Sequence, residues 1–275
     1  MPLYKGCGLC MIGPMSEILL GTSGFSYNDW KGEFYPSQMG AGSYLEFYSQ
    51  HFSTVELNFS YYRIPNEKQI SQMLVSSENR LCFVIKAYRG MTHEISRDSL
   101  GIILQEYLNG IAPLSEAGLL GGVLLQFPQS FHYTKENRQY LKALIDKMLP
   151  LPLVVEFRQK EWLRDSVYKA LEELGVGFVC VDEPELPSLV PPLVITTSDI
   201  GYVRFHGRNK ENWYGTDATA RYDYLYSKEE LQEWVPRIRE LSSRSKKLFV
   251  VFNNHARAQA VTNADMLKGF LSANY

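Results

Sequence analysis

The chain has 275 residues, of which 45% are hydrophobic and 21% are charged, as is ordinary for a globular protein. Its formal net charge is −2, whereas many nucleic-acid-binding proteins are basic overall. This net charge does not exclude a local basic groove. No run approaches the roughly 20 apolar residues of a membrane span, so we expect no membrane partner.

The first segment, residues 1–16, is expected to be an N-terminal tail without a function of its own. Gly, Pro and Ser interrupt its apolar residues, which is unlike a secretory signal peptide. Cys7 and Cys10 form a lone C-x-x-C, whereas a structural zinc site needs four ligands. Four cysteines in the whole chain are few, and we expect them to be reduced, as in a cytoplasmic protein.

The remaining residues, 17–275, are predicted to form one domain in which short strands alternate with helices. The strands are rich in Val, Ile, Leu and Phe and mostly lack polar alternation, as in parallel sheets that are covered on both faces. The eight predicted strands are residues 17–23, 54–60, 81–88, 120–127, 153–158, 177–182, 202–206 and 248–253.

Helical signals fill the gaps between these strands. Ser43 with Glu46, and Ser227 with Glu230, have the spacing of a capping box ahead of an apolar run. Only the connection 183–201, which contains four prolines, lacks a convincing helix. Eight strand-then-helix units in about 250 residues predict an α/β fold, a closed (β/α)8 TIM barrel. A doubly wound sheet is the alternative, but no Gly-rich phosphate loop follows the first strand.

Polar side chains gather at the carboxyl ends of the predicted strands, where TIM barrels carry their functional sites. In the second, fifth and seventh strands the charged residues share one parity, so we expect them to face the barrel axis. Charges buried there are costly unless they pair, contact water or bind a ligand, and a self-satisfied lattice of salt bridges is the structural alternative to a site. The predicted mouth residues are Glu56, Asn58, Lys86, Gln126, Glu156, Arg158, Asp182, Arg204, His206, Asn253 and Asn254.

The loops that follow these strands add aromatic and basic side chains. Aromatic rings can stack on a sugar or a base, and Arg side chains can hold an anion. We therefore expect a small-molecule or nucleic-acid-like anionic ligand. The loop residues expected to contact it are Tyr27, Trp30, Tyr62, Arg63, His93, Arg208 and Trp213.

Eight segments of the chain resemble one known family. They are "GTSGFSYNDWKGEFYP", "TVELNFSYYRIP", "FVIKAYRGMTH", "LLQFPQSF", "VEFRQKEW", "VDEP", "VRFHGRN" and "VFNNHARAQAVTNA". From about residue 18 to the C-terminus the chain resembles the domain of unknown function 72 (DUF72) family, in which such segments occur in the same order. The resemblance implies a TIM barrel, distantly similar to those of xylose isomerase and endonuclease IV, and it does not specify a reaction.

The mouth residues favour a hydrolase or lyase that acts on a phosphate-bearing or nucleic-acid-like substrate. Lys86, Arg158 and Arg204 would hold the anion. The predicted catalytic residues are Glu56, Lys86, Glu156, Asp182 and His206, with Lys86 also a candidate Schiff-base amine. No cofactor is predicted. One divalent cation on a mouth carboxylate stays open, but the Lys and Arg among the carboxylates argue against a dedicated metal site.

Two other functions stay open. A glycosidase needs two carboxyl groups about 5–10 Å apart, and Glu156 and Asp182 lie on neighbouring predicted strands. The common barrel glycosidases place their acids after strands four and seven, where this chain has Gln126 and His206. A non-catalytic module that binds a nucleotide or nucleic acid through the rim is the third hypothesis, which the acidic net charge disfavours. The sequence indicates no oligomeric state.

Overall fold

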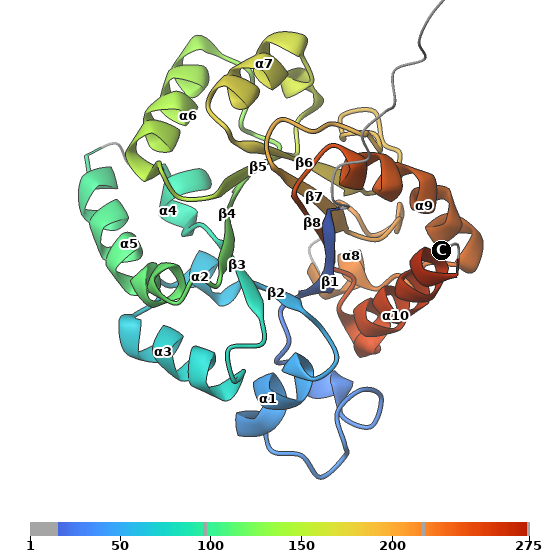
Figure 1. Ribbon diagram of the computed structural model, residues 1–275. Coiled ribbons are helices and arrows are strands. Elements are labelled where there is room, and N and C mark those ends of the chain that lie inside the picture. The colour runs from blue at the N-terminus through green and yellow to red at the C-terminus, as the bar shows by residue number, and fades with distance from the viewer. Residues whose placement is uncertain (1–15, 96–97, 216–217, 274–275) are drawn as a thin grey trace, which may run out of the picture.

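The computed structural model describes residues 16–95, 98–215 and 218–273. Within them, eight parallel strands close into a barrel in the order in which they occur in the sequence (Figure 1). The strands are β1 (Glu17–Ser23), β2 (Thr54–Leu57), β3 (Cys82–Lys86), β4 (Leu120–Phe127), β5 (Leu153–Phe157), β6 (Gly177–Asp182), β7 (Ile200–Phe205) and β8 (Lys247–Phe252). The predicted (β/α)8 TIM barrel is confirmed. Cys7 and Cys10, and all of the expected tail except Ser16, lie outside the described residues.

Helices surround the barrel and also occur in the loops at its carboxyl end. The α-helices are α1 (Tyr44–Ser49), α2 (Phe59–Tyr62), α3 (Glu67–Ser76), α4 (Arg89–Thr92), α5 (Leu100–Glu116), α6 (Lys135–Met148), α7 (Asp165–Glu173), α8 (Ala218–Tyr222), α9 (Lys228–Ser243) and α10 (Gln259–Ser272). Short 3-10 helices are η1 (Asn28–Trp30), η2 (Ala41–Ser43), η3 (Lys160–Trp162) and η4 (Ala256–Ala258). Residues 183–199 contain no helix, as predicted for the connection between the sixth and seventh strands.

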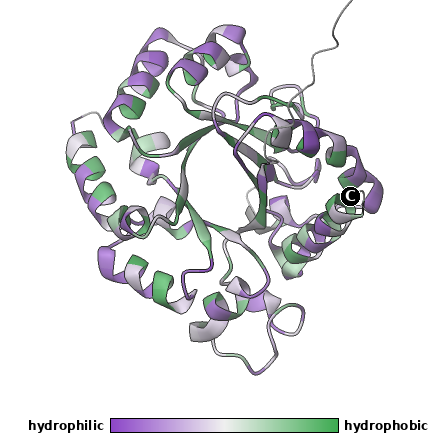
Figure 2. Cartoon of the chain, viewed as in Figure 1, coloured by the Kyte–Doolittle hydropathy of each residue, from purple (hydrophilic) through white to green (hydrophobic). Residues whose placement is uncertain are grey.

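The helices are amphipathic, and their apolar sides cover the barrel. Val55, Val155 and Val203 point outward from their strands and belong to the cluster that the strands share with the helices. Figure 2 shows hydrophobic residues along the strands and hydrophilic residues on the outer sides of the surrounding helices. Among the described residues, none of the helices combines the length and the apolar character that crossing a bilayer requires.

Side chains inside the barrel form an apolar layer with a charged layer above it, towards the carboxyl ends. The apolar layer includes Leu19, Val84, Leu124, Val154, Val179, Val181, Tyr202, Phe249 and Val251. Because strand residues alternate between two faces, residues two positions further along also face the axis. Glu156 follows Val154 in this way, and Arg204 follows Tyr202. The Tyr202 hydroxyl donates across the barrel to Glu56 at 2.8 Å. The predicted parity of these charged residues is confirmed.

Only one of the two predicted capping boxes forms. Ser227 Oγ accepts from the backbone N–H of Glu230 at 3.2 Å, and the Glu230 carboxylate accepts from the N–H of Ser227 at 2.9 Å. Ser43 makes no capping bond, so that prediction is wrong. The reason is local, because Ser43 already ends the 3-10 helix η2 and has ψ near 2°, whereas a capping residue needs an extended backbone.

Candidate active site

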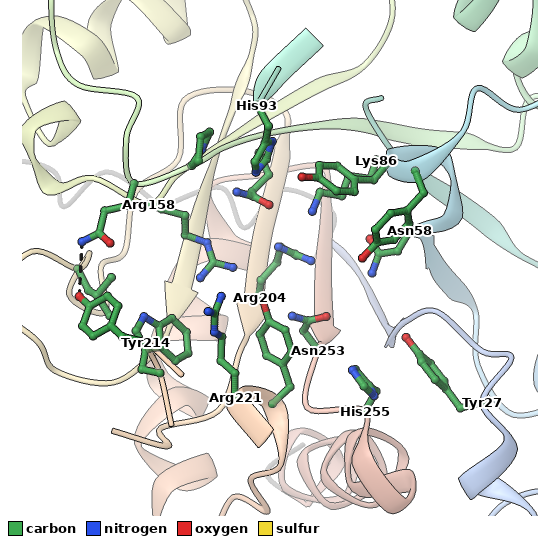
Figure 3. Close-up of a pocket in the computed structure, with 18 residues that line it drawn as sticks. Tyr27, Asn58, Lys86, His93, Arg158, Arg204, Tyr214, Arg221, Asn253 and His255 are labelled. Carbon is green, nitrogen blue, oxygen red and sulfur yellow. Dashed lines mark hydrogen bonds between the residues drawn. The ribbon is translucent and has the colours of Figure 1, made fainter. Parts of the chain in front are cut away.

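A cavity of about 620 Å³ opens at the carboxyl ends of the strands (Figure 3). This is the end at which TIM barrels carry their sites, and the volume suits a small organic molecule. The predicted residues that line it are Tyr27, Asn58, Tyr62, Lys86, His93, Gln126, Arg158, Arg204, Trp213 and Asn253. The other residues that line it are Tyr61, Pro128, Gln129, Leu189, Tyr214, Arg221, Tyr222 and His255.

The lining of this cavity is cationic. Four of its described residues carry a basic side chain of the Lys or Arg type, and none is Asp or Glu. Figure 3 shows Arg158, Arg204 and Arg221 pointing towards the same space. An anion placed there meets several charged donors without facing a carboxylate.

The carboxylates lie beneath the cavity in a buried network centred on Arg204. Its Nη1 donates to Glu156 at 2.7 Å and its Nη2 to Glu56 at 2.6 Å. Glu56 also accepts from Ser23 Oγ at 2.5 Å and from Tyr202. Both carboxylates are fully buried, and Arg204 is 2% exposed. The lattice of salt bridges therefore exists, but it forms the floor of the cavity and does not fill it.

Arg158 joins this floor to the wall of the cavity. Its Nε donates to Glu156 at 2.5 Å and its Nη1 to Glu183 at 2.8 Å. Burial would raise the pKa of the Glu156 carboxyl, but Arg204 and Arg158 outweigh it and hold that pKa well below its usual range. Glu156 is therefore an ionised acceptor that holds two guanidinium groups in place.

His206 is a neutral member of the network. Burial, and then the charge of Arg158, lower the pKa of this imidazole well below its usual range. Its ring nitrogen Nε2 lies 3.0 Å from Arg158 Nη2, and Asn253 Nδ2 lies 3.1 Å from its Nδ1. The Asn253 amide reaches the cavity, whereas the His206 ring is fully buried behind it.

Two titratable groups of the site have pKa values close to neutrality. Burial, followed by the charge of Arg204, lowers the pKa of Lys86 to about 7. Burial raises the pKa of Glu183 to about 7, against the opposing effect of Arg158. An acid or base with a pKa near the working pH is the kind of group that proton transfer requires.

Lys86 and His93 lie against the same aromatic ring. The Lys86 Nζ is 4.5 Å from the centroid of Tyr61, and the His93 ring meets Tyr61 edge-on at 4.9 Å. The ion pairs of the described residues engage Arg158 and Arg204 but not Lys86. Burial, and then the charge of Lys86, lower the pKa of His93 to about 4.

Aromatic side chains support the opposite wall. The guanidinium carbons of Arg158 and Arg221 each lie 5.8 Å from the ring of Trp213, which thus contacts both cations. Tyr27 stacks on His255 with the ring centroids 4.6 Å apart. The wall therefore offers fixed cations and flat apolar surfaces side by side.

Asp182 does not face the cavity, and the expectation that it does is wrong. Val179 and Val181 of β6 point inward, so Asp182 points outward, towards α9. Its carboxylate accepts from Trp234 Nε1 at 2.6 Å and from the Tyr226 hydroxyl at 2.7 Å. It also accepts hydrogen bonds from Nε and Nη2 of Arg208, which is thereby held away from the cavity as well.

Three further residues expected to contact a substrate lie outside the cavity. Trp30 is fully buried and donates its Nε1 to the carbonyl of His255 at 2.6 Å, so it supports the wall from behind. The Asn254 amide donates to the carbonyl of Tyr224. Arg63 is exposed and lies over the ring of Phe59 on α2. In each of these three residues, the side chain that was expected to contact a ligand contacts another part of the protein instead.

No group of three His, Cys, Asp or Glu side chains is arranged to hold a metal ion within the described parts of the chain. The oxygens of Glu56 and Glu156 are directed at Arg204, which occupies the place a cation would take.

The sequence and the fold agree with one family. Residues 19–275 match the family described as protein of unknown function DUF72. The chain belongs to the DUF72 family. A DUF72 protein from Thermotoga maritima MSB8 is similar in structure, with 40% identity and a TM-score of 0.86 over 93% of this chain and 99% of that one.

Two other proteins are similar to this DUF72 chain. UPF0759 protein YunF of Bacillus subtilis (strain 168) is 31% identical over 94% of this chain and 96% of its own length. A xylose isomerase domain protein from Alicyclobacillus acidocaldarius has 13% identity and a TM-score of 0.50 over 94% of this chain and 99% of that one. At that identity the similarity concerns the barrel fold alone. The predicted family and the distant likeness to xylose isomerase barrels are confirmed.

Sequence reasoning missed Glu183, although a signal for it was present. The inward parity of β6 runs through positions 179 and 181 and therefore continues to 183, one residue past Asp182. Tyr61, Arg221 and Tyr222 come from short helices in the loops of this DUF72 barrel, where no periodicity indicates which side chains turn inward.

The low pKa of His93 predicts a pH dependence of stability. The ordinary pKa of the unfolded imidazole is near 6.5, so its stabilising contribution is present above pH 6.5 and is lost as the pH falls towards 4. His93→Asn is expected to reduce the loss of stability between pH 7 and pH 5 by about 1 kcal/mol, allowing for partial exposure. Urea denaturation at the two pH values measures it.

The control for this pH experiment is His132→Asn, which removes an exposed imidazole that lies beside Glu161. If His93→Asn loses as much stability on acidification as the parent protein does, the imidazole is not kept neutral by the fold.

Proposed function

We propose that this protein is a cytoplasmic hydrolase or lyase that acts on a small phosphate-bearing substrate in the cavity at the carboxyl ends of the strands. The observation that carries the proposal is the lining of the cavity, which combines basic, amide and aromatic side chains and has no carboxylate among its described residues. A volume of about 620 Å³ favours a nucleotide-sized or smaller molecule over a nucleic-acid duplex.

The arginines of the cavity differ in whether a carboxylate of the protein already pairs with them. Arg158 and Arg204 are held by buried carboxylates, so they present fixed donors to the cavity. Arg221 forms no ion pair with a described residue, and its Nε has no hydrogen-bond partner among them. We assign the main anion contact to Arg221, since a phosphate there gains new charge-assisted hydrogen bonds and breaks no ion pair between described residues.

The hydrogen-bond partners of the acids and bases also change the catalytic roles that the sequence suggested for them. Glu56 and Glu156 accept hydrogen bonds from Arg204 on both sides of the barrel, so they are positioning residues in this proposal. Lys86 and His93 reach the cavity, form no ion pair with a described carboxylate, and take the acid–base work. Glu183 serves as a buried proton reservoir next to Arg158.

A glycosidase is the weaker alternative. It requires two carboxyl groups that flank a sugar, and the pair expected from sequence was Glu156 and Asp182. The first of these holds Arg204 and Arg158, and the second is hydrogen-bonded behind the barrel to Trp234. Hydrolysis of simple nitrophenyl glycosides by the purified protein would favour this alternative.

A nucleic-acid-binding module without catalysis is the other alternative. The rim supplies the aromatic and basic side chains that single strands use, but the net charge of −2 disfavours strong retention. Salt-dependent binding of a single-stranded oligonucleotide, together with no turnover of phosphate esters by phosphorus NMR, would favour it over an enzyme.

The proposal includes no cofactor. A single divalent cation stays an alternative, and activity assays with and without added Mg²⁺ and Mn²⁺ after treatment with a chelator would decide it. The cytoplasmic location is supported by Cys82 and Cys180, the described cysteines, which are free thiols as expected in a reducing compartment.

Substitution of Arg221 tests the anion site. Arg221→Met is expected to weaken the binding of inorganic phosphate about 10- to 100-fold, because it removes a charged donor that forms no ion pair with a described residue. Isothermal titration calorimetry at low ionic strength measures the change, and added salt should weaken binding to the parent protein.

The matched control is Arg63→Met, in the loop after β2 directly following α2 and outside the cavity. It is expected to leave phosphate binding within about twofold. Equal losses in the two variants, or no phosphate binding by the parent protein at millimolar concentration, would contradict the proposed function.

A further inference from the structure

We infer that Lys86 is a nucleophile that forms an imine with the carbonyl carbon of an anionic aldehyde or ketone. The inference rests on the proposed function and deepens it, because it specifies the lyase chemistry and adds a carbonyl group to the substrate. It depends on the placement of the Lys86 amine, on the absence of a carboxylate partner for it, and on the cations that surround it.

The backbone places the Lys86 side chain at the axis of the barrel. Lys86 is the last residue of β3 and lies two positions after Val84, a member of the inner apolar layer. Its Nζ lies 4.5 Å from the centroid of the Tyr61 ring. Figure 3 shows the side chain beside the space towards which Arg158 and Arg204 also point.

A structural role does not account for a lysine at this position. Moving an ammonium group out of water is costly, and proteins usually offset that cost with a paired carboxylate. The two carboxylates beneath the cavity are instead shared with Arg204, and Lys86 has no ion pair among the described residues. The arrangement thus lowers the affinity of the amine for its proton without pairing it with a described carboxylate.

Lysine also provides what the arginines of the cavity cannot. Guanidinium groups stay protonated in proteins, so further anion binding would be served equally well by another arginine. With a pKa of about 7, roughly half of the Lys86 side chains are neutral at pH 7. An exposed lysine with a pKa near 10.4 is neutral in only about one molecule in 2,500 at that pH. Only the neutral amine attacks a carbonyl group.

The proposed step is balanced in atoms and charge. The lone pair of the neutral Lys86 Nζ forms a bond to the carbonyl carbon, and the π electrons of the C=O bond move to the oxygen, which takes up a proton. The nitrogen loses one proton, the oxygen takes it, and water leaves. Amine, carbonyl compound and one proton thus give a protonated imine and one water molecule. The protonated imine then withdraws electrons from a bond at the adjacent carbon, which is the step that a lyase needs.

The neighbours of Lys86 suit the two ends of such a substrate. His93, which contacts the same Tyr61 ring, is placed to relay protons between nitrogen and oxygen. Arg221, across the cavity beside Trp213, would hold the anionic group and so fix the carbonyl group near the amine. The positive charge of the imine is compensated by the bound anion.

Reductive trapping tests the imine directly. The full chain is incubated at pH 7 with glyceraldehyde 3-phosphate and cyanoborohydride, and the modified lysines are located by peptide mass spectrometry. Lys86 is expected to be modified at least about tenfold faster than exposed lysines, because far more of its amine is neutral. The rate should rise with pH to a half-maximum near pH 7. Uncharged glyceraldehyde should modify Lys86 more slowly, since Arg221 cannot hold it.

Two variants make the result specific. Lys86→Arg keeps the positive charge, cannot form an imine, and is expected to lose the fast modification while still binding inorganic phosphate. Lys160→Arg removes an exposed lysine of the loop after β5 and is expected to leave the fast modification unchanged.

The outcomes separate this inference from the proposed function. If phosphate binds with the expected dependence on Arg221 but Lys86 is modified no faster than exposed lysines, the imine is wrong and the proposed anion site stands. If phosphate does not bind and Lys86 is not trapped, both fail. Fast trapping of Lys86 that does not depend on the phosphate group would overturn the assignment of an anionic substrate.

Discussion

Glu156→Gln is expected to lower the free energy of unfolding by about 3–5 kcal/mol, the largest effect of any single substitution in the site. The carboxylate is fully buried and accepts hydrogen bonds from Arg158 at 2.5 Å and Arg204 at 2.7 Å. Glutamine has nearly the same shape, so the loss comes from charge. Two guanidinium groups would lose a shared counter-ion, and the NH2 group of the amide would point a donor at one of them. Chemical denaturation at pH 7 measures the change.

The control is Glu78→Gln, which removes the carboxylate of the exposed ion pair between Arg80 and Glu78. Exposed pairs contribute about 0–1 kcal/mol, so this variant should be nearly neutral. If the two variants lose similar amounts, the buried network does not depend on the charge of Glu156. In that case the floor of the cavity would be held mainly by packing.

Most of the barrel could be predicted because its signals are periodic and local. Eight apolar runs gave the strands, and the parity of Glu156 and Arg204 relative to their apolar neighbours gave the inward direction of both side chains. Four prolines predicted that the connection between β6 and β7 contains no helix, as the structure shows. The closed sheet confirms the eight strands, although the second ends at Leu57 and not at residue 60, because Phe59 begins α2.

The sequence could not predict which polar residues are structural and which face a ligand, because this depends on contacts between segments that are distant in the chain. The sequence places Glu56, Glu156 and Lys86 at one mouth but does not say which acid pairs with which base. Arg204 takes both glutamates, 148 and 48 residues away along the chain. That choice leaves Lys86 without an ion pair among the described residues, which is the feature on which the imine depends.

The cavity and its floor thus divide the charges between them. Among the described residues of the site, the acids Glu56, Glu156 and Glu183 lie in the buried floor and hold arginines, and the residues that line the cavity include the basic groups. Preorganised cations that need not reorient are effective at stabilising negative charge, because the cost of ordering them is met when the protein folds. The salt-bridge lattice and the proposed site are therefore parts of one arrangement.

Asp182→Asn is expected to destabilise the protein by about 2–4 kcal/mol without weakening phosphate binding by more than about twofold. The Asp182 carboxylate accepts from Trp234, Tyr226 and Arg208, all of which are donors, and an asparagine NH2 group would confront at least one of them. The expected loss of stability is smaller than for Glu156→Gln, because Arg208 is partly exposed and water can hydrate its guanidinium group. Denaturation and calorimetry on the same preparation give the two numbers.

Glu233→Gln is the matched control, because Glu233 contacts the same Arg208 at 3.2 Å from the exposed side of α9. It should cost no more than about 1 kcal/mol. A folded Asp182→Asn protein that keeps its stability but loses phosphate binding or the trapping of Lys86 would restore the catalytic role expected from the sequence. The opposite result would mean that a carboxylate at the end of a barrel strand can be structural when its parity turns it towards a helix. In this chain a shift of one residue reverses the direction of the side chain. Asp182 points outward to Trp234, whereas the adjacent Glu183 contacts Arg158 of the site.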